Sequence, residues 1–224
     1  MRFRLLLLML VVCAGAAFAA NMPVTNPSFE NDGGLLTNSC GGSCLYGYGT
    51  PPGWSQFGAT GIMQPGAPYP DGLFNYVPNG QNIALVDAGT LTNGRIWQVI
   101  GNAVPGTTYT LQVDFGWAFN SSYATPYAWL QIGNNAVAAT GIDPTQGNWS
   151  TFTATYNAGI VDNGNPIEIV LGIYAGNEAL FDNVCVMTGN SGCQGISPSP
   201  EPTGLILLGS GIGLLPLLGR RFMR

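Results

Sequence analysis

The amino-acid sequence predicts an all-β fold in which two sheets pack against each other as a sandwich. Gly and Pro are abundant in this 224-residue chain, with 33 and 16 copies, and they mark turns between short segments. Those segments alternate apolar and polar residues, whereas no helical period persists. In Tyr109–Trp117, for example, odd positions are apolar and even positions are polar or small. We therefore expect one face of this strand to pack in the core and the other to meet solvent.

Nine strands are expected along the chain, separated by turns rich in Gly, Asn and Pro. They cover Val24–Phe29, Gly53–Phe57, Gln81–Asp87, Arg95–Ile100, Thr108–Ala118, Tyr127–Ile132, Ser150–Tyr156, Pro166–Tyr174 and Ala179–Met187. About nine strands at irregular spacing are typical of a two-sheet sandwich. The domain that they form spans residues 20–187, and residues 188–199, rich in Gly, Ser and Pro, are expected to be a flexible linker.

The charge of the folded part excludes several functions. Between Asn21 and Pro200 ten Asp or Glu residues accompany a single base, Arg95. Nucleic-acid binding requires clustered Lys or Arg, so it is excluded as a function. The chain contains no His, which removes the Ser-His-Asp and Cys-His nucleophiles and every His-ligated zinc site. Calcium, a hard cation, is the natural partner of so many carboxylates.

Residues 1–19 have the three parts of a secretory signal peptide. Arg2 and Arg4 precede the apolar run Leu5–Val12, and the small residues that follow end at Ala17-Phe18-Ala19. The apolar run is too short to span a bilayer, and an Ala-x-Ala cleavage site follows it. We expect cleavage after Ala19 and export of the chain.

Residues 200–224 resemble the PEP-CTERM sorting signal. Pro200, Glu201 and Pro202 are followed by an uncharged span, Thr203–Gly219, and then by Arg220, Arg221 and Arg224. The resemblance implies an inner-membrane-anchored precursor with its arginines in the cytoplasm, and cleavage near Pro-Glu-Pro by an exosortase. About 17 apolar residues make a marginal span, and positive residues stay inside. A simple C-terminal anchor is the alternative.

Four short motifs of residues 20–187 resemble the galactose-binding-like jelly rolls, which include many carbohydrate-binding modules. They are Val24–Glu30, Gly53-Trp54, Pro105–Leu111 and Phe181–Val184. The resemblance implies a structural calcium ion where the first strand meets the last, with Glu30 and Asp182 as ligands and backbone carbonyls supplying others. The alternative is that both acids only cap turns. At the level of the fold, the chain is also similar to calcium-dependent indole-terpenoid cyclases, but no local motif transfers a catalytic residue.

The four cysteines of the exported part are expected to form two disulfides. They are Cys40, Cys44, Cys185 and Cys193, an even number in an oxidising compartment. Three pairings are formally open, and the local one, Cys40 with Cys44 and Cys185 with Cys193, closes small loops rich in Gly and Ser. Metal binding by Cys40-Gly-Gly-Ser-Cys44 is the competing interpretation.

Two strands carry candidate ligand-binding residues. Gln112 and Asp114 alternate away from the core side of one strand, and Trp129 and Gln131 alternate away from it in another. An aromatic face together with amide and carboxylate groups is what sugar recognition requires. If the two strands are neighbours, the four residues form one patch. Alternatively, Trp129 packs under a loop.

No catalytic residue is assigned. A glycosidase would need two acids on either side of the scissile bond, and no spacing in the sequence singles out a pair. We therefore interpret the chain as a non-catalytic, exosortase-sorted surface or extracellular-matrix protein whose jelly roll binds polysaccharide. Its tail would lie transiently in the inner membrane, and its mature form would be at the cell surface or extracellular. Two alternatives remain open: a calcium-dependent cyclase or lyase-type enzyme on the same sandwich, and a purely structural surface protein.

Overall fold

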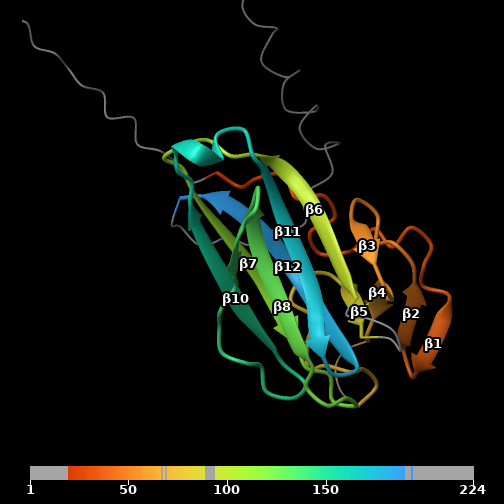
Figure 1. Cartoon of the computed structure of the whole chain (residues 1–224). Helices are drawn as coiled ribbons and strands as arrows, with labels where there is room; N and C mark the ends of the chain where they lie inside the picture. The colour runs from red at the N-terminus through yellow and green to blue at the C-terminus, as the bar shows by residue number, and fades with distance from the viewer. Residues whose placement is uncertain (1–19, 67, 69, 89–93, 190–192, 194–224) are drawn as a thin grey trace, which may run out of the picture. The chain divides into compact units, whose positions relative to one another are not determined.

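The computed structural model describes residues 20–66, 68, 70–88, 94–189 and 193. These residues form twelve strands and one short 3-10 turn, η1 (Ile160–Asp162). The paired strands are antiparallel and build two sheets that face each other (Figure 1). The all-β, two-sheet jelly-roll sandwich that the sequence predicts is confirmed. In the described part of the chain, no helix is long and apolar enough to cross a membrane.

The larger sheet has seven strands in the order β1-β2-β4-β5-β12-β7-β10. Their bounds are β1 (Asn38–Gly41), β2 (Cys44–Tyr48), β4 (Thr60–Gln64), β5 (Ile83–Asp87), β12 (Glu178–Thr188), β7 (Thr108–Gly116) and β10 (Trp149–Asn157). Strands that are far apart in the sequence thus become neighbours, since β12 lies between β5 and β7.

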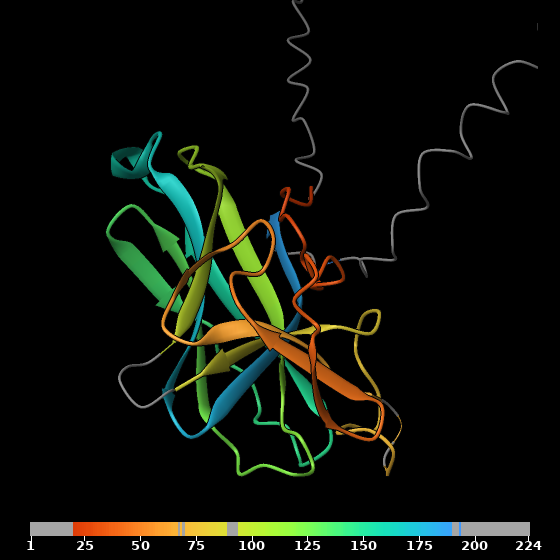
Figure 2. The ribbon, with the colours of Figure 1, turned by 90° about the vertical axis from the view of Figure 1, so that its right-hand side faces the viewer.

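The smaller sheet has five strands in the order β3-β6-β11-β8-β9. Their bounds are β3 (Ser55–Phe57), β6 (Arg95–Asn102), β11 (Pro166–Ala175), β8 (Thr125–Ile132) and β9 (Asn135–Ala138). Figure 2 shows the green and cyan strands β8, β9 and β11 along one side of the molecule. Their outward-pointing side chains are therefore not covered by the larger sheet.

The main core lies between the two sheets. Three phenylalanines pack at its centre: Phe115 stacks on Phe152 with ring centroids 4.1 Å apart and meets Phe181 edge-on at 5.1 Å. Facing them, β8 and β11 contribute alternate aliphatic residues such as Leu130 and Ile169, both fully buried. The alternation that predicted strands is therefore the alternation that fills this core.

A second apolar cluster lies on the outer face of the seven-stranded sheet. It forms because the cover segment, residues 65–82, crosses that face between β4 and β5. Phe74 of the cover segment is fully buried and packs on Trp149 of β10 with ring centroids 4.6 Å apart. The Trp149 indole Nε1 also donates to the carbonyl oxygen of Tyr76 at 2.9 Å. Asp114 of β7, expected at solvent, is consequently buried.

The expected strand Val24–Phe29 is wrong. Asn26 and Phe29 have positive φ angles of 50° and 61°, and Pro27 interrupts the segment, so it cannot continue a strand ladder. Among residues 20–29, the isolated β-bridge is that of Asn21 with Met187. The short strands β1, β2, β4 and β9 were not expected. The segments expected to be a signal peptide (1–19) and a sorting signal (200–224), and most of the expected linker (188–199), lie outside the described residues.

Candidate functional site

Two acids lie side by side at one end of the seven-stranded sheet. Glu178 begins β12 and Asp87 ends β5, and the register pairs these two residues directly. Directly opposed residues of an antiparallel pair have neighbouring side chains on the same face. The adjacent pair on this face is Leu180 with Leu85, both of the second apolar cluster. The acid pair therefore borders apolar surface.

Tyr48 of β2 completes this group. Its hydroxyl donates a hydrogen bond to Asp87 Oδ2 at 3.0 Å. Strand β4 lies between β2 and β5, and the residue opposite Tyr48 there is Gly61. Because Gly61 has no side chain, the tyrosine can reach across β4. Burial, and then the hydrogen bond to Asp87 and its charge, raise the pKa of Tyr48 to about 12, so the phenol keeps its proton.

The environment of Glu178 favours the protonated carboxyl. Burial, and secondly the negative charge of Asp87, raise the pKa of Glu178 above its ordinary value. The side chain nevertheless keeps part of its surface accessible. A carboxyl group that holds its proton at higher pH and can still be reached is suited to donate that proton to a bound molecule.

Aromatic surface adjoins the acid pair. The rings of Tyr46 and Tyr48 meet edge-on with centroids 5.8 Å apart, and Tyr48 is 52% exposed. Exposed aromatic faces can stack on a planar ligand and attract a positive charge. We call the two acids and the two tyrosines together the acid site: Glu178, Asp87, Tyr48 and Tyr46. The second apolar cluster borders this site.

A second carboxylate cluster lies further along the same sheet face. Glu30 Oε1 accepts hydrogen bonds from the backbone N–H groups of Gln81 and Asn82, at 2.9 and 2.8 Å. Asp182 Oδ2 accepts one from the N–H of Asn79 at 2.9 Å. The two acids thus hold the same turn, residues 79–82, and the structure brings together the pair that the sequence assigned to calcium.

The buried setting of this cluster is one that a bound cation would stabilise. Asp182 is fully buried, and burial raises its pKa to about 8, with backbone hydrogen bonds opposing the shift and the charges of Asp114 and Glu30 adding to it. The buried Asn82 Oδ1 has no hydrogen-bond partner. No group of three or more His, Cys, Asp or Glu with metal-binding geometry occurs in the described ranges. The atoms that could bind a metal here are all oxygens, as calcium prefers. Two residues offer carboxylates, and the other ligands would be amide or carbonyl oxygens.

The four residues expected to form one ligand patch lie on different sheets. Gln112 and Asp114 belong to β7 of the seven-stranded sheet, whereas Trp129 and Gln131 belong to β8 of the five-stranded sheet. Asp114 accepts hydrogen bonds from Thr151 and Asn183, at 2.6 and 3.1 Å.

Gln112 and Gln131 likewise have partners inside the protein. Gln112 Oε1 accepts from the N–H of Cys193 at 2.8 Å, and Gln131 Nε2 donates to the carbonyl oxygen of Gly133 at 2.9 Å. Trp129 packs against Tyr127, with centroids 4.7 Å apart. The four residues therefore do not form one surface. Strand alternation predicts on which face of its strand a residue lies, but it does not predict which strands are neighbours.

Both disulfides are local. Cys40 pairs with Cys44, and Cys185 pairs with Cys193. The first closes the β1–β2 hairpin, and the second folds the chain after β12 back onto β7 near Gln112.

A pocket of about 370 Å³ opens between this hairpin and the cover segment. It is lined by Ser43, Gln64, Gly66, Val77, Gly80 and Gln81. None of these residues is acidic, so the pocket could hold a neutral molecule but offers no proton donor stronger than an amide or hydroxyl group.

The sequence analysis missed the acid site. Asp87 and Glu178 lie 91 positions apart in the sequence, and the pairing of β5 with β12 brings them together. The one available signal was that each acid adjoins an apolar strand segment.

Comparison with known proteins gives one family and several structures of the same fold. The family model described as HpiC1-like, HpiC1 cyclase, matches residues 20–186. A cyclase from Fischerella sp. in its apo form is 21% identical over 76% of this chain and 97% of that chain, with a TM-score of 0.63. The Stig cyclase Fisc from Fischerella sp. TAU, in complex with (3Z)-3-(1-methyl-2-pyrrolidinylidene)-3H-indole, is 23% identical over 77% and 99%, with a TM-score of 0.64.

A cyclase from Fischerella sp. TAU in complex with 4-(1H-indol-3-yl)butan-2-one is similar to the same degree. It is 22% identical over 77% of this chain and 98% of that chain, with a TM-score of 0.63. At these identities, the likeness to the solved structures shows a shared fold. No curated protein matches the chain.

These findings contradict the interpretation as an exosortase-sorted surface protein that binds polysaccharide. Exosortase and polysaccharide are therefore withdrawn as partners. The motifs that suggested a binding module build the sandwich itself: Trp54 packs on Phe29 with centroids 5.5 Å apart, and Phe181 is in the core. One scaffold can host many functions, so motifs that build the scaffold say nothing about the ligand. No finding supports the sorting-signal resemblance of residues 200–224.

Proposed function

The chain belongs to the HpiC1-like cyclase family, and we propose that it is an enzyme that cyclises a small, indole-bearing substrate. The observation that carries the proposal is the family match, which spans nearly the whole described sandwich. Two structures of this fold, both described as cyclases from Fischerella sp. TAU, hold bound indole compounds. Of the two alternatives that the sequence left open, the cyclase is the one that these similarities support.

The acid site supplies the chemistry that such a reaction needs. Protonation of a carbon–carbon double bond by Glu178 would leave a cation on the substrate, and attack on that cation by a second π-bond would close a ring. Loss of a proton from the new ring to the Glu178 carboxylate restores the acid, so atoms and charge balance. Tyr46 and Tyr48 give the cation an aromatic wall. Asp87, held by Tyr48, keeps negative charge beside Glu178 and so favours its protonated form.

The cyclisation assay has a direct chemical readout. An indole that carries an unsaturated isoprenoid chain should be converted to an isomer of unchanged mass and altered chromatographic retention. Glu178→Gln should lower this rate about 100- to 10,000-fold, the usual contribution of a general acid, while the folded protein still binds 4-(1H-indol-3-yl)butan-2-one.

Asp71→Asn is the control for this assay, because Asp71 is an exposed acid of the cover segment. It should behave as the unmodified protein does. Unchanged turnover in Glu178→Gln would move the acid to another residue, and the absence of any isomer with the unmodified protein would reject the cyclase proposal.

Calcium at the second carboxylate cluster is part of the proposal. Glu30, Asp182 and the Oδ1 atom of Asn82 would hold the ion, which supplies the positive charge that this buried group lacks. Since Asp182 and Glu30 both hold residues 79–82, the ion would fix the end of the cover segment against β12. Its role would be structural, because the acid pair lies at the opposite end of β5.

We also propose that the protein is exported. The signal-peptide pattern of residues 1–19 and the two disulfides support an oxidising destination. Expressed in a bacterial host, the secreted form should begin at Ala20, as N-terminal sequencing or intact-mass measurement can determine. Recovery of a cytoplasmic chain that still starts at Met1, with all five cysteines as free thiols, would contradict export.

A further inference from the structure

Two loops at one end of the sandwich expose aliphatic side chains. Ile160 and Val161 of η1 are 87% and 85% exposed, and Val104 of the β6–β7 loop is 58% exposed. Figures 1 and 2 show the two loops next to each other, with η1 in teal. We call residues 102–108 and 157–166 the loop tip. Neighbouring aliphatic side chains that protrude this far into water indicate a surface that a partner covers.

The loop tip carries no exposed charge. Its one charged residue is Asp162, which is 3% exposed. Asp162 Oδ2 accepts hydrogen bonds from the N–H of Gly159 at 2.7 Å and from the hydroxyl of Tyr156 at 3.1 Å. The sandwich as a whole is acidic, with ten Asp or Glu residues and the single base Arg95 in residues 20–194. Moving the loop tip into an apolar medium therefore dehydrates no exposed charge, which is the most costly part of such a transfer.

The backbone of the loop tip is hydrogen-bonded within the protein. The five successive carbonyl oxygens of residues 158–162 all accept hydrogen bonds, at 2.8 to 3.4 Å. Their donors are the N–H groups of Gly106, Asp162, Asn163 and Asn165 and the side-chain Nδ2 of Asn165. The two loops are also joined to each other, because the N–H of Ala103 donates to Asn165 and that of Gly164 donates to Ala103. Lipid offers no partner to backbone groups, so a backbone satisfied in this way is the kind that can enter it.

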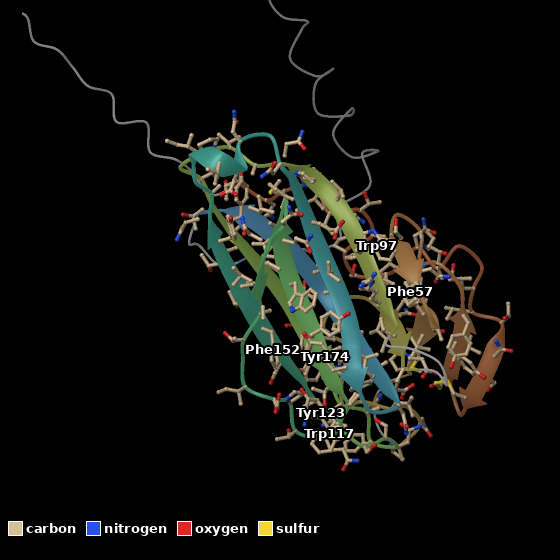
Figure 3. The ribbon with its side chains drawn as sticks, viewed as in Figure 1. Phe57, Trp97, Trp117, Tyr123, Phe152 and Tyr174 are labelled. Carbon is tan, nitrogen blue, oxygen red and sulfur yellow. A yellow bond between two sulfur atoms is a disulfide. The ribbon has the colours of Figure 1, made fainter. Side chains whose placement is uncertain are left out.

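The opposite end of the sandwich has a different surface. Its loops carry Trp117 and Tyr123 (Figure 3), and the Tyr123 hydroxyl donates to Asp143 at 2.9 Å. The acid site is at this end too. Strand β12 begins there at Glu178 and ends at Thr188, where it pairs with the start of β7 beside the loop tip. A surface bound by the loop tip would therefore leave the acid site facing away from it.

We propose that the loop tip docks onto a lipid bilayer, with Ile160, Val161 and Val104 inserted between the headgroups and the acyl chains. These side chains protrude from loop ends, and a fluid lipid surface accommodates such a shape, whereas a protein partner would need a matching groove. Interfacial binding grows with the apolar area inserted and with electrostatic attraction to the lipid. Because the sandwich is acidic and the loop tip is uncharged, zwitterionic lipid fits and anionic lipid repels. The proposal is independent of the cyclase activity.

The test uses residues 20–194, so that the tail cannot contribute. They lie within one compact unit that ends at Gln194, and they contain both sheets and both disulfides. The match to the apo cyclase and to Fisc covers 97% and 99% of those chains, so a sandwich of this fold is complete without a further segment.

Sedimentation with sucrose-loaded phosphatidylcholine vesicles measures the binding. At about 1 mM lipid, the unmodified fragment should sediment with the vesicles. Ile160→Asp should lower the partition coefficient by about tenfold or more, because an inserted aliphatic side chain is replaced by a charge. Replacing part of the phosphatidylcholine by phosphatidylglycerol should weaken the binding of the unmodified fragment.

Ile142 provides the matched control. It is 84% exposed in the β9–β10 loop, next to Asp143, and Ile142→Asp makes the same change of side chain and charge away from the loop tip. This variant should bind as the unmodified fragment does, and both variants should keep its melting temperature. Tryptophan emission should shift to the blue when vesicles are added to Ile160→Trp but not to Ile142→Trp.

Two results would overturn the proposal. One is an unmodified, folded fragment that stays in the supernatant at this lipid concentration, which would leave the loop tip to a protein partner. The other is an equal loss of binding in Ile160→Asp and Ile142→Asp, which would show that added charge, and not the loop tip, decides the binding.

Discussion

At the scale of single residues, the molecule depends on carboxyl groups whose protonation the fold controls. Burial and neighbouring negative charge act on both Glu178 and Asp182. Their consequences differ, because Glu178 remains partly accessible and Asp182 is fully buried. An accessible protonated carboxyl can do chemistry, while a sealed one makes stability depend on pH or on a cation.

Asp182 gives a pH prediction with a definite sign. Its folded pKa of about 8 lies above the ordinary value of 3.8, so the native state holds a proton that the unfolded state releases between these values. In the presence of a chelator, the free energy of unfolding should therefore fall as pH rises from about 4 to 8, by on the order of 5 kcal/mol at most. Thermal melts across this range measure the slope.

Calcium should reverse that dependence, because the ion binds the ionised carboxylate and its affinity grows as the proton leaves. Asp182→Asn should flatten the slope in chelator and remove the stabilisation by calcium, whereas Asp71→Asn should change neither. Identical melting curves with chelator and with millimolar calcium at pH 8 would remove the metal from this site.

At the scale of elements, the cover segment is the least regular and most consequential part of the fold. It turns the outer face of the seven-stranded sheet into a second core, and its contacts with Trp149 and with Asp182 tie it to strands that are distant in sequence. The acid site borders this second core. Loosening the cover segment should therefore affect the acid site before it affects the main core.

Phe74 is the anchor whose loss should show this. Phe74→Ala removes a fully buried ring from its contact with Trp149 and should cost about 3 to 5 kcal/mol in free energy of unfolding. Trp149 should become more exposed, which a red shift of tryptophan emission reports. Tyr76→Ala is the matched control, since its side chain is 49% exposed and the hydrogen bond from Trp149 goes to its backbone carbonyl, which the substitution keeps. An equal loss of stability in both variants would mean that Phe74 is not a specific anchor of the cover segment.

At the scale of the whole molecule, the sequence predicted the fold class because alternation is a local property. The run Tyr109–Trp117 reads correctly as a strand without knowledge of its neighbours. Strand order is not a local property. The sequence therefore could not show that β7 and β8 belong to different sheets, or that Glu178 pairs with Asp87. The pair Glu30 and Asp182 was found because the resemblance joined the two ends of the domain.

Function escaped the sequence for a related reason. The most recognisable motifs, such as Gly53-Trp54 and Phe181–Val184, are conspicuous because they build the scaffold that many proteins share. The acids that distinguish this chain chemically are single residues without a motif. In the proposed reaction, these inconspicuous positions carry the chemistry.

The two ends of the sandwich meet at one place. Ala20 and Thr188 are hydrogen-bonded through their backbones at 2.9 Å, and Asn21 bridges Met187. Glu178 stands at the opposite end of the same 11-residue strand, roughly 33 Å away at about 3.3 Å per residue. A tag, a fusion partner or a solid support joined at Ala20 would thus hold the protein from the end farthest from its acid site. Immobilised in this way, the protein would leave Glu178 open to dissolved substrate, as catalysis in a flow reactor requires.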